Sequence, residues 1–105
     1  MKILIRLLYI FLATITSVNA EDSLLFFTAD WCSHCIKAKE DIEANNIEAF
    51  NNLIYINYDQ SKDFVKSYNI KKIPTFILLN DKGKEIDRKV GYSGIKNLIE
   101  FVRKK

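Results

Sequence analysis

Thr28-Ala29-Asp30-Trp31-Cys32-Ser33-His34-Cys35 holds both cysteines of this 105-residue chain. The stretch follows the apolar run Leu24–Phe27 and leads into a segment of helical composition. Two thiols separated by two residues at the start of a helix can close into a small disulfide and reopen at low cost. The free N–H groups and the dipole of a helix N-terminus favour a thiolate, which is the nucleophile of disulfide exchange. We therefore predict a dithiol redox site at Cys32 and Cys35.

Two other interpretations of the cysteine pair are inert buried thiols and half of a zinc site. A structural zinc site needs about four ligands, and the chain offers two cysteines and one histidine. Covalent haem attachment needs a histidine directly after the second cysteine, where Ile36 stands. A disulfide that encloses two residues constrains the unfolded chain very little, so it adds little stability. We predict that the pair serves redox chemistry, with no metal and no cofactor.

The first twenty residues have the order of a secretory signal peptide, with a basic, an apolar and a cleavable part. Lys2 and Arg6 carry their only charges, residues 7–15 are almost all apolar, and Ala20 ends a short run of small or modest residues. We expect cleavage after Ala20, which leaves a domain over residues 21–105. Export places that domain in an oxidising compartment, the periplasm in our expectation. The alternative is an uncleaved anchor that holds the domain outside the cytoplasm.

Charge and length limit the function classes. The chain has 16 basic and 13 acidic residues, a formal net charge of +3, and residues 21–105 alone carry +1. Apart from the terminal Arg103-Lys104-Lys105, basic and acidic residues are interleaved, which gives little support for a nucleic-acid partner. The length suits one small domain with a single core.

Apolar patterning predicts four strands and three helices. The expected strands are 24–28, 53–58, 73–79 and 85–90, and the expected helices are 33–45, 61–68 and 95 to the C-terminus. A turn at residues 80–83 joins the last two strands into a hairpin. The order strand, helix, strand, helix, strand, strand, helix predicts an α/β fold with a mixed four-stranded sheet flanked by helices.

The large side chains are divided between core and surface in our expectation. The aromatic residues expected in the core are Phe26, Phe27, Phe76 and Tyr55, with Trp31 as the exception. One face of the expected helix 61–68 carries Phe64, Val65 and Tyr68.

Three motifs give the chain its resemblance to a known family. They are Ala29-Asp30-Trp31-Cys32-Ser33-His34-Cys35, Ile73-Pro74-Thr75 and Val90-Gly91. With the element order above, the chain resembles the thioredoxin superfamily over essentially all of residues 21–105. The sequence Thr28-Ala29-Asp30-Trp31-Cys32 is most similar to that of the thioredoxin-like domains of periplasmic thiol:disulfide interchange proteins. The resemblance implies a minimal thioredoxin fold of order βαβαββα after the signal peptide.

The resemblance also implies roles for the residues of the dithiol site. Cys32 would be the exposed attacking thiol, and Cys35 the shielded thiol that resolves a mixed disulfide. Pro74 would follow a cis peptide bond and pack against the disulfide. His34, between the cysteines, could donate to the Cys32 thiolate or attract it, which stabilises the reduced form and makes the disulfide more oxidising.

A groove for a client peptide is implied as well. The backbone of Ile73 would pair with an extended client, and Trp31, Thr75 and Gly91 would border the same groove. The implied partners are cysteine-containing exported proteins and a redox-partner protein, with the chain acting as a monomer.

Three departures from thioredoxin itself matter. The N-terminal strand and helix that thioredoxin places before this point are missing from the pattern. Thioredoxin has a buried acid six residues before its first cysteine, where this chain has Phe26, and the lysine that accompanies that acid falls near Tyr55. We therefore expect proton transfer at Cys35 to rely on water or on a surface acid such as Asp30 or Glu40.

Together these observations predict an exported protein-disulfide oxidoreductase that works through Cys32 and Cys35. His34 and the missing acid favour a more oxidising dithiol–disulfide couple. The Ala29-Asp30-Trp31-Cys32 sequence instead resembles carriers that reduce their clients, so the direction of electron flow stays open. The alternative from another class is a redox-inactive thioredoxin-like binding module or a metal-handling protein.

Overall fold

The computed structural model describes residues 22–46, 48–50 and 52–103. The predicted signal peptide, residues 1–20, lies outside these ranges. The described elements, in chain order, are β1 (Ser23–Thr28), α2 (Ser33–Asn45), the 3-10 turn η1 (Glu48–Phe50), β2 (Leu53–Asn57), α3 (Lys62–Ser67), β3 (Thr75–Leu79), β4 (Glu85–Val90) and α4 (Ile95–Val102). This order confirms the predicted sequence of strands and helices, and η1 is the element that was not predicted.

The four strands form one mixed sheet in the order β2-β1-β3-β4. β1 runs parallel to β2, and the β2 edge pairs Phe26 with Tyr55 and Thr28 with Asn57. β1 is antiparallel to β3, and β3 is antiparallel to β4. The two parallel strands therefore end at the same edge of the sheet, where the Cys32–Cys35 segment follows β1.

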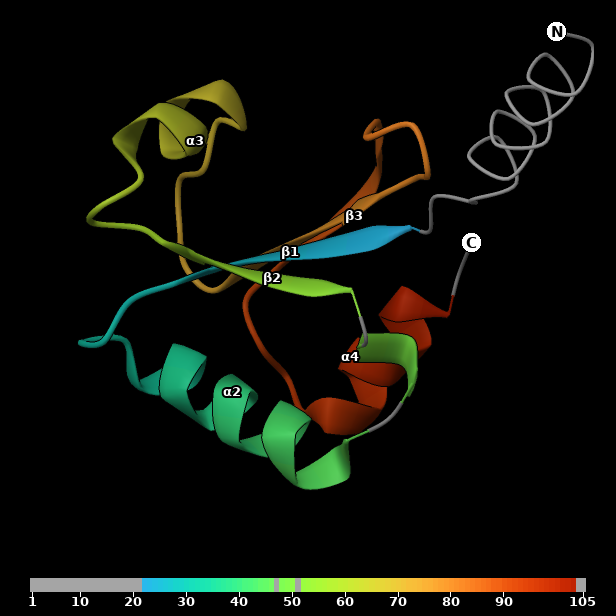
Figure 1. The fold of residues 1–105 in the computed structure, drawn as a ribbon. Coiled ribbons are helices and arrows are strands. Elements are labelled where there is room, and N and C mark those ends of the chain that lie inside the picture. Colours follow the sequence, from blue (N-terminus) through green and yellow to red (C-terminus); the bar gives the residue numbers. More distant parts are fainter. Residues whose placement is uncertain (1–21, 47, 51, 104–105) are drawn as a thin grey trace, which may run out of the picture.

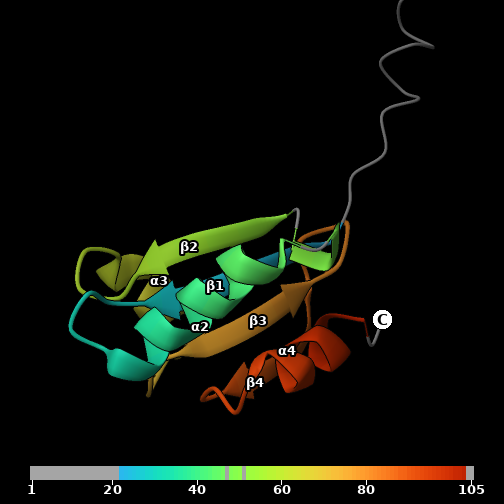
Figure 2. The same cartoon turned by 90° about the horizontal axis from the view of Figure 1, so that it is seen from below.

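Helices cover both faces of the sheet. α2 and α4 lie on one face of the sheet, and α3 lies on the other (Figure 1). Seen from below, α2 covers β1 and β2, and α4 lies near β3 and β4 (Figure 2). The alternation along β1 sends Leu24 and Phe26 into the core beneath α2 and α4, and Leu25 and Phe27 into the core beneath α3. Both faces of the central strands are thus buried, as their continuous apolar sequences predict.

The predicted core is mostly confirmed. Phe26, Phe27 and Phe76 are fully buried, and Trp31 is exposed as expected. Tyr55 was expected in the core and is 41 % exposed, because β2 is an edge strand and its side chain lies at the rim of the helix-covered face.

Phe64 is the second correction. It was expected on the buried face of α3 with Val65 and Tyr68, but it is 53 % exposed and stacks on the outer side of the Tyr68 ring, with ring centroids 6.5 Å apart. Val65 and Tyr68 do pack on the core. A six-residue helix turns too few times to bury three large side chains against one sheet.

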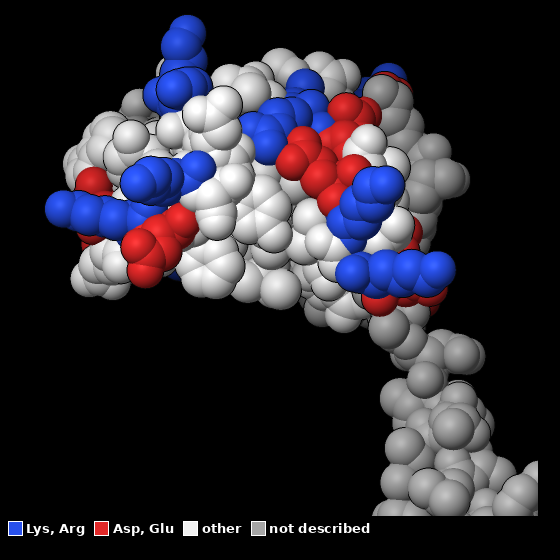
Figure 3. Space-filling model, turned by 90° about the horizontal axis from the view of Figure 1, so that it is seen from above, with Lys and Arg blue, Asp and Glu red and all other residues white. Residues whose placement is uncertain are grey.

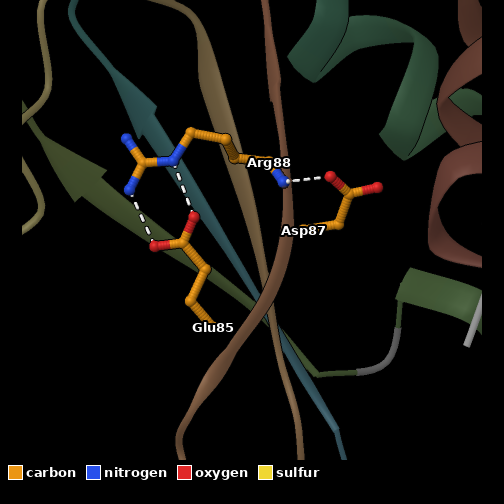
Figure 4. Close-up of polar contacts among 3 residues, drawn as sticks. All are labelled: Glu85, Asp87 and Arg88. Atoms are coloured by element: carbon orange, nitrogen blue, oxygen red, sulfur yellow. Dashed lines mark hydrogen bonds and ion pairs between the residues drawn. The ribbon is translucent and has the colours of Figure 1, made fainter.

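The β3–β4 hairpin is stabilised by its turn and by one ion pair. Asn80 Oδ1 accepts the backbone N–H groups of Lys82 and Lys84, both at 2.9 Å. On β4 the Arg88 guanidinium donates to both carboxylate oxygens of Glu85 at 2.7 Å, while the Arg88 backbone N–H donates to Asp87 (Figure 4). The contact with Arg88 lowers the pKa of Glu85.

Candidate active site

The two cysteines lie at the junction of β1 and α2, and they form a disulfide with their Cα atoms 5.2 Å apart. Cys32 is the N-cap of α2, and its Sγ accepts the backbone N–H of Cys35 at 3.2 Å. The Cys32 sulfur thus sits where the free N–H groups of a helix N-terminus meet, which favours negative charge on it after reduction. The predicted placement of the dithiol on a strand-to-helix junction is confirmed.

The exposures of the two cysteines differ in the predicted direction but not to the predicted extent. Cys35 is 0 % exposed, as a shielded resolving thiol requires, and Cys32 is 7 % exposed. Cys32 is therefore the more accessible thiol, but it is largely covered rather than exposed as expected. The N-cap position turns its sulfur toward the backbone of the first helical turn, which accounts for the cover.

A second loop carries the Ile73-Pro74-Thr75 motif. The Ile73–Pro74 peptide bond is cis, as the resemblance implied, and Pro74 is buried. The Pro74 carbonyl accepts the backbone N–H of Gly91 at 2.8 Å, so the two loops at this end of β3 and β4 are joined. Ile73 packs against the same core cluster as both cysteines.

Two predicted groove residues have no free side chain to present to a client. Thr75 is 1 % exposed, and its hydroxyl donates to the Lys72 carbonyl at 2.5 Å. Gly91 has a φ of 89°, a left-handed conformation that glycine adopts without strain.

Trp31 is the prominent exposed side chain of the site. It is 66 % exposed, and its indole Nε1 donates to Asp59 Oδ2 at 2.7 Å. Asp59 is not among the residues predicted from the sequence. The available signal was topological: Trp31 and Asp59 each follow one of two neighbouring parallel strands, whose ends meet at one edge of the sheet.

His34 lies in the first turn of α2 and is exposed. Within the part of the chain that the structure describes, its side chain has no hydrogen bond or ion pair.

The space that a buried acid occupies in thioredoxin is apolar here. Phe26 is 0 % exposed and stacks on Phe76, with ring centroids 4.5 Å apart. The ring of Tyr55 packs at an angle to that of Phe26, with ring centroids 5.4 Å apart. A cleft of about 490 Å³ opens beside this cluster, between α2 and the ends of β1 and β2. The predicted proton acceptors Asp30 and Glu40 both line this cleft, and so does Cys35.

A polar contact ties α2 to the loop that follows β4. The Tyr92 hydroxyl donates to Asp41 Oδ2 at 2.5 Å, and Lys37 Nζ lies 3.1 Å from Asp41 Oδ1. The hydrogen bond from Tyr92, with help from Lys37, lowers the pKa of Asp41. Burial first, and then the contact with Asp41, raises the pKa of Tyr92. The contact holds the Gly91–Tyr92 loop, and with it one wall of the expected groove, against the helix that carries the cysteines.

The rest of the surface shows mixed charge. On the face that carries α3 and the β3–β4 turn, basic and acidic side chains gather in small mixed groups separated by neutral residues (Figure 3). Across residues 22–46, 48–50 and 52–103, no three His, Cys, Asp or Glu side chains come together as a metal site would require. In the same ranges, no helix is both long and apolar enough to span a bilayer.

Comparison with known proteins supports the assignment that this geometry suggests. The model of the thioredoxin family matches residues 10–104. Thioredoxin of Chlamydia trachomatis is 33 % identical over 82 residues, which cover 77 % of this chain and 79 % of that protein. The TPR repeat-containing thioredoxin TDX of Arabidopsis thaliana is 33 % identical over 70 residues, and the match spans only 18 % of that protein.

Solved structures agree with the fold. The thioredoxin of Fasciola hepatica superposes with a TM-score of 0.71 at 26 % identity, with 88 % of each chain covered. A protein disulfide-isomerase of Ricinus communis is a more distant sequence relative, 26 % identical over 105 residues and matched over 21 % of its length. With its dithiol at the start of α2 and its cis proline beside β3, the chain belongs to the thioredoxin family of thiol–disulfide oxidoreductases.

Proposed function

We propose that this protein is an exported thiol–disulfide oxidoreductase that exchanges disulfides with other exported proteins through Cys32 and Cys35. The observation that carries the proposal is the disulfide at the N-terminus of α2, with one sulfur partly accessible and the other enclosed. That asymmetry suits a two-step exchange, because the accessible thiol meets the client and the enclosed thiol waits for the mixed disulfide.

In the reducing direction the Cys32 thiolate attacks a client disulfide and forms a mixed disulfide, and one client thiolate leaves. Cys35 then attacks the Cys32 sulfur, the bond to the client breaks, and the second client thiolate leaves. The client has gained two electrons, and the protein has lost two by closing the Cys32–Cys35 disulfide. The reverse sequence oxidises a client dithiol.

Client binding is assigned to the loops around the dithiol. Trp31, held by Asp59, forms one side, and the backbone of Ile73, Thr75 and Gly91 forms the other. Because these loops offer mainly backbone and one aromatic surface, we propose that they accept extended segments of varied sequence.

Export is proposed from residues 1–20, whose basic, apolar and cleavable parts have the order of a signal peptide. Periplasmic fractionation of the full-length chain, with N-terminal sequencing of the product, tests this part separately. A product that starts at Glu21 supports export with cleavage, whereas an intact chain in the membrane fraction supports the anchored alternative.

The exchange itself is tested by trapping. In Cys35→Ala, Cys32 can attack a client but nothing resolves the product, so we expect mixed disulfides that dissolve on addition of dithiothreitol. In Cys32→Ala, the enclosed Cys35 should trap none. Trapping by neither variant, together with no insulin reduction by the unmodified protein, would identify a redox-inactive binding module instead. Equal trapping by both variants would contradict the roles of Cys32 as the attacking thiol and Cys35 as the resolving thiol.

The direction of electron flow is decided by the reduction potential of the Cys32–Cys35 pair. A value near about −270 mV indicates a reductant, and one near about −120 mV indicates an oxidant. Equilibration with glutathione buffers, read by alkylation of the free thiols, gives this value.

A further inference from the structure

The cleft between α2 and β2 lies beside the resolving thiol of Cys35. Cys35 is buried, yet it lines the inner wall of a cleft of about 490 Å³ between α2 and β2. The resolving thiol must lose its proton in the reaction, and Phe26 replaces the buried acid expected to receive it. Cys35 therefore faces this cleft, although it is 0 % exposed.

Lys39 is placed to act in this cleft. It follows Cys35 by four residues on α2, so the two side chains share a face of the helix, and both line the cleft. The Lys39 ammonium lies 5.2 Å from the centre of the Tyr55 ring, and that ring rests on Phe26 at 5.4 Å. Lys39 is exposed, and a cation over an aromatic face is attracted to it electrostatically, so Tyr55 favours a position of Lys39 at the cleft.

The other charged and titratable groups around the cleft are acids and one phenol. Asp30 comes from the end of β1, Glu40 and Glu43 come from α2, and Tyr55 comes from β2. Burial, and then the negative charge of Glu43, raises the pKa of Tyr55, so the phenol stays neutral at physiological pH. Lys39 is the one cation among the residues that line this cleft. Lys37, two residues away on α2, does not line the cleft and is paired with Asp41.

We propose that Lys39 is a positioning residue for the resolving step, whose ammonium, held over Tyr55, favours the Cys35 thiolate. The proposal rests on the exchange function proposed above. In this step the Cys35 thiol gives its proton to water in the cleft, and the resulting thiolate attacks the Cys32 sulfur. The Cys32–Cys35 bond forms, the bond from Cys32 to the client breaks, and the client sulfur leaves with the electron pair. A nearby positive charge lowers the free energy of the thiolate relative to the thiol. This stabilisation partly offsets the absence of a buried base.

The test separates the two chemical steps. Reduced protein is mixed with excess dithiodipyridine, an uncharged aromatic disulfide, and the released pyridinethione is followed by stopped-flow absorbance. The first phase depends on reagent concentration and reports attack by Cys32, and the second is independent of it and reports attack by Cys35. Failure of the first phase counts against the proposed function, whereas the second phase tests Lys39.

We expect Lys39→Gln to slow the second phase about three- to tenfold at neutral pH, the effect of losing one charge at close range in a partly solvated site. The midpoint of its pH–rate curve should move to higher pH, and strong salt should narrow the gap to the unmodified protein. Lys39→Arg keeps the charge and should restore the rate. Glu43→Gln should speed the second phase, because it removes an opposing charge from the same cleft.

Lys96→Gln is the matched control. It removes the same charge from an exposed position on α4 that does not line the cleft, so its second phase should be unchanged. A second phase unaffected by Lys39→Gln would overturn the proposal. An equal slowing in Lys96→Gln would do so too, because it would show an effect of net charge rather than of the position of Lys39.

Discussion

At the scale of single residues, the chemistry depends on how each sulfur is surrounded. Cys32 caps α2 and is within reach of helix N–H groups, while Cys35 is enclosed between the helix and the Phe26 cluster. The same helix therefore gives one thiol access and a stabilising dipole, and gives the other neither exposure nor a buried base. We expect the neighbours His34 and Lys39 to influence the reactivity of the pair as well, which the spacing of two cysteines does not reveal.

The role of His34 leads to the first residue-scale prediction. His34→Ser should make the reduction potential more negative by about 15–30 mV, because loss of the imidazole removes an interaction that favours the reduced form. Ser33→Ala, a change at the neighbouring exposed position, serves as the control. Equal potentials for His34→Ser and the unmodified protein would contradict the prediction.

At the scale of elements, the fold depends on apolar contact between helices and sheet far more than on surface ion pairs. α4 has a strongly one-sided apolar pattern and buries Leu98, Phe101 and Val102 beneath the sheet. The Glu85–Arg88 contact on β4 has good geometry, but both side chains are about one-third exposed. Water and salt therefore screen the ion pair, so it adds little to the free energy of unfolding. Removal of a buried side chain leaves a cavity and lowers the free energy of unfolding much more.

These two contacts give an element-scale prediction. Leu98→Ala should lower the free energy of unfolding by about 2–5 kcal/mol, since Leu98 is fully buried and its removal leaves a cavity. Glu85→Gln should lower it by less than about 1 kcal/mol. Urea denaturation of both variants at one pH and ionic strength gives the comparison. A Glu85→Gln effect as large as that of Leu98→Ala would mean that the hairpin depends on its ion pair.

At the scale of the whole molecule, distant parts of the chain meet around the dithiol. Tyr92 reaches from the loop after β4 to Asp41 on α2, fifty-one residues away in sequence. Asp59, after β2, reaches Trp31, after β1. The site is therefore assembled from α2 and from the loops that follow β1, β2 and β4, and its shape depends on contacts between segments far apart in the sequence.

The Tyr92–Asp41 contact predicts a pH dependence. Because the folded state lowers the pKa of Asp41, the stability from this contact is present above the unfolded value near about 4 and is lost as the pH falls through the folded value. Because it raises the pKa of Tyr92, that residue's contribution is present below about 10 and is lost as the pH rises through the folded value.

Tyr92→Phe should therefore lower the melting temperature most between about pH 4 and pH 10. The difference in melting temperature from the unmodified protein should become smaller in acid. Tyr58→Phe, at a half-buried tyrosine without a side-chain partner within residues 22–46, 48–50 and 52–103, is the control. Thermal denaturation from acidic to neutral pH follows both variants. A gap that stays constant with pH would mean that the hydroxyl acts through packing alone.

The sequence predicted the features that depend on local pattern. The position of the dithiol, the element order and the buried rings of β1 and β3 follow from apolar runs and turn residues close together in the chain. The exposure of Tyr55 and the Trp31–Asp59 hydrogen bond depend on strand order and register, which a run of β-forming residues does not specify. η1 escaped prediction because three residues carry no periodic signal.

Trp31 is the only tryptophan in the chain, and it immediately precedes Cys32. Its indole is largely in solvent, with Nε1 bound to Asp59. Tryptophan emission from this protein therefore arises from a single position at the edge of the dithiol site. The molecule carries its own optical probe there, so opening of the disulfide and arrival of a client can be followed by fluorescence without attaching a label.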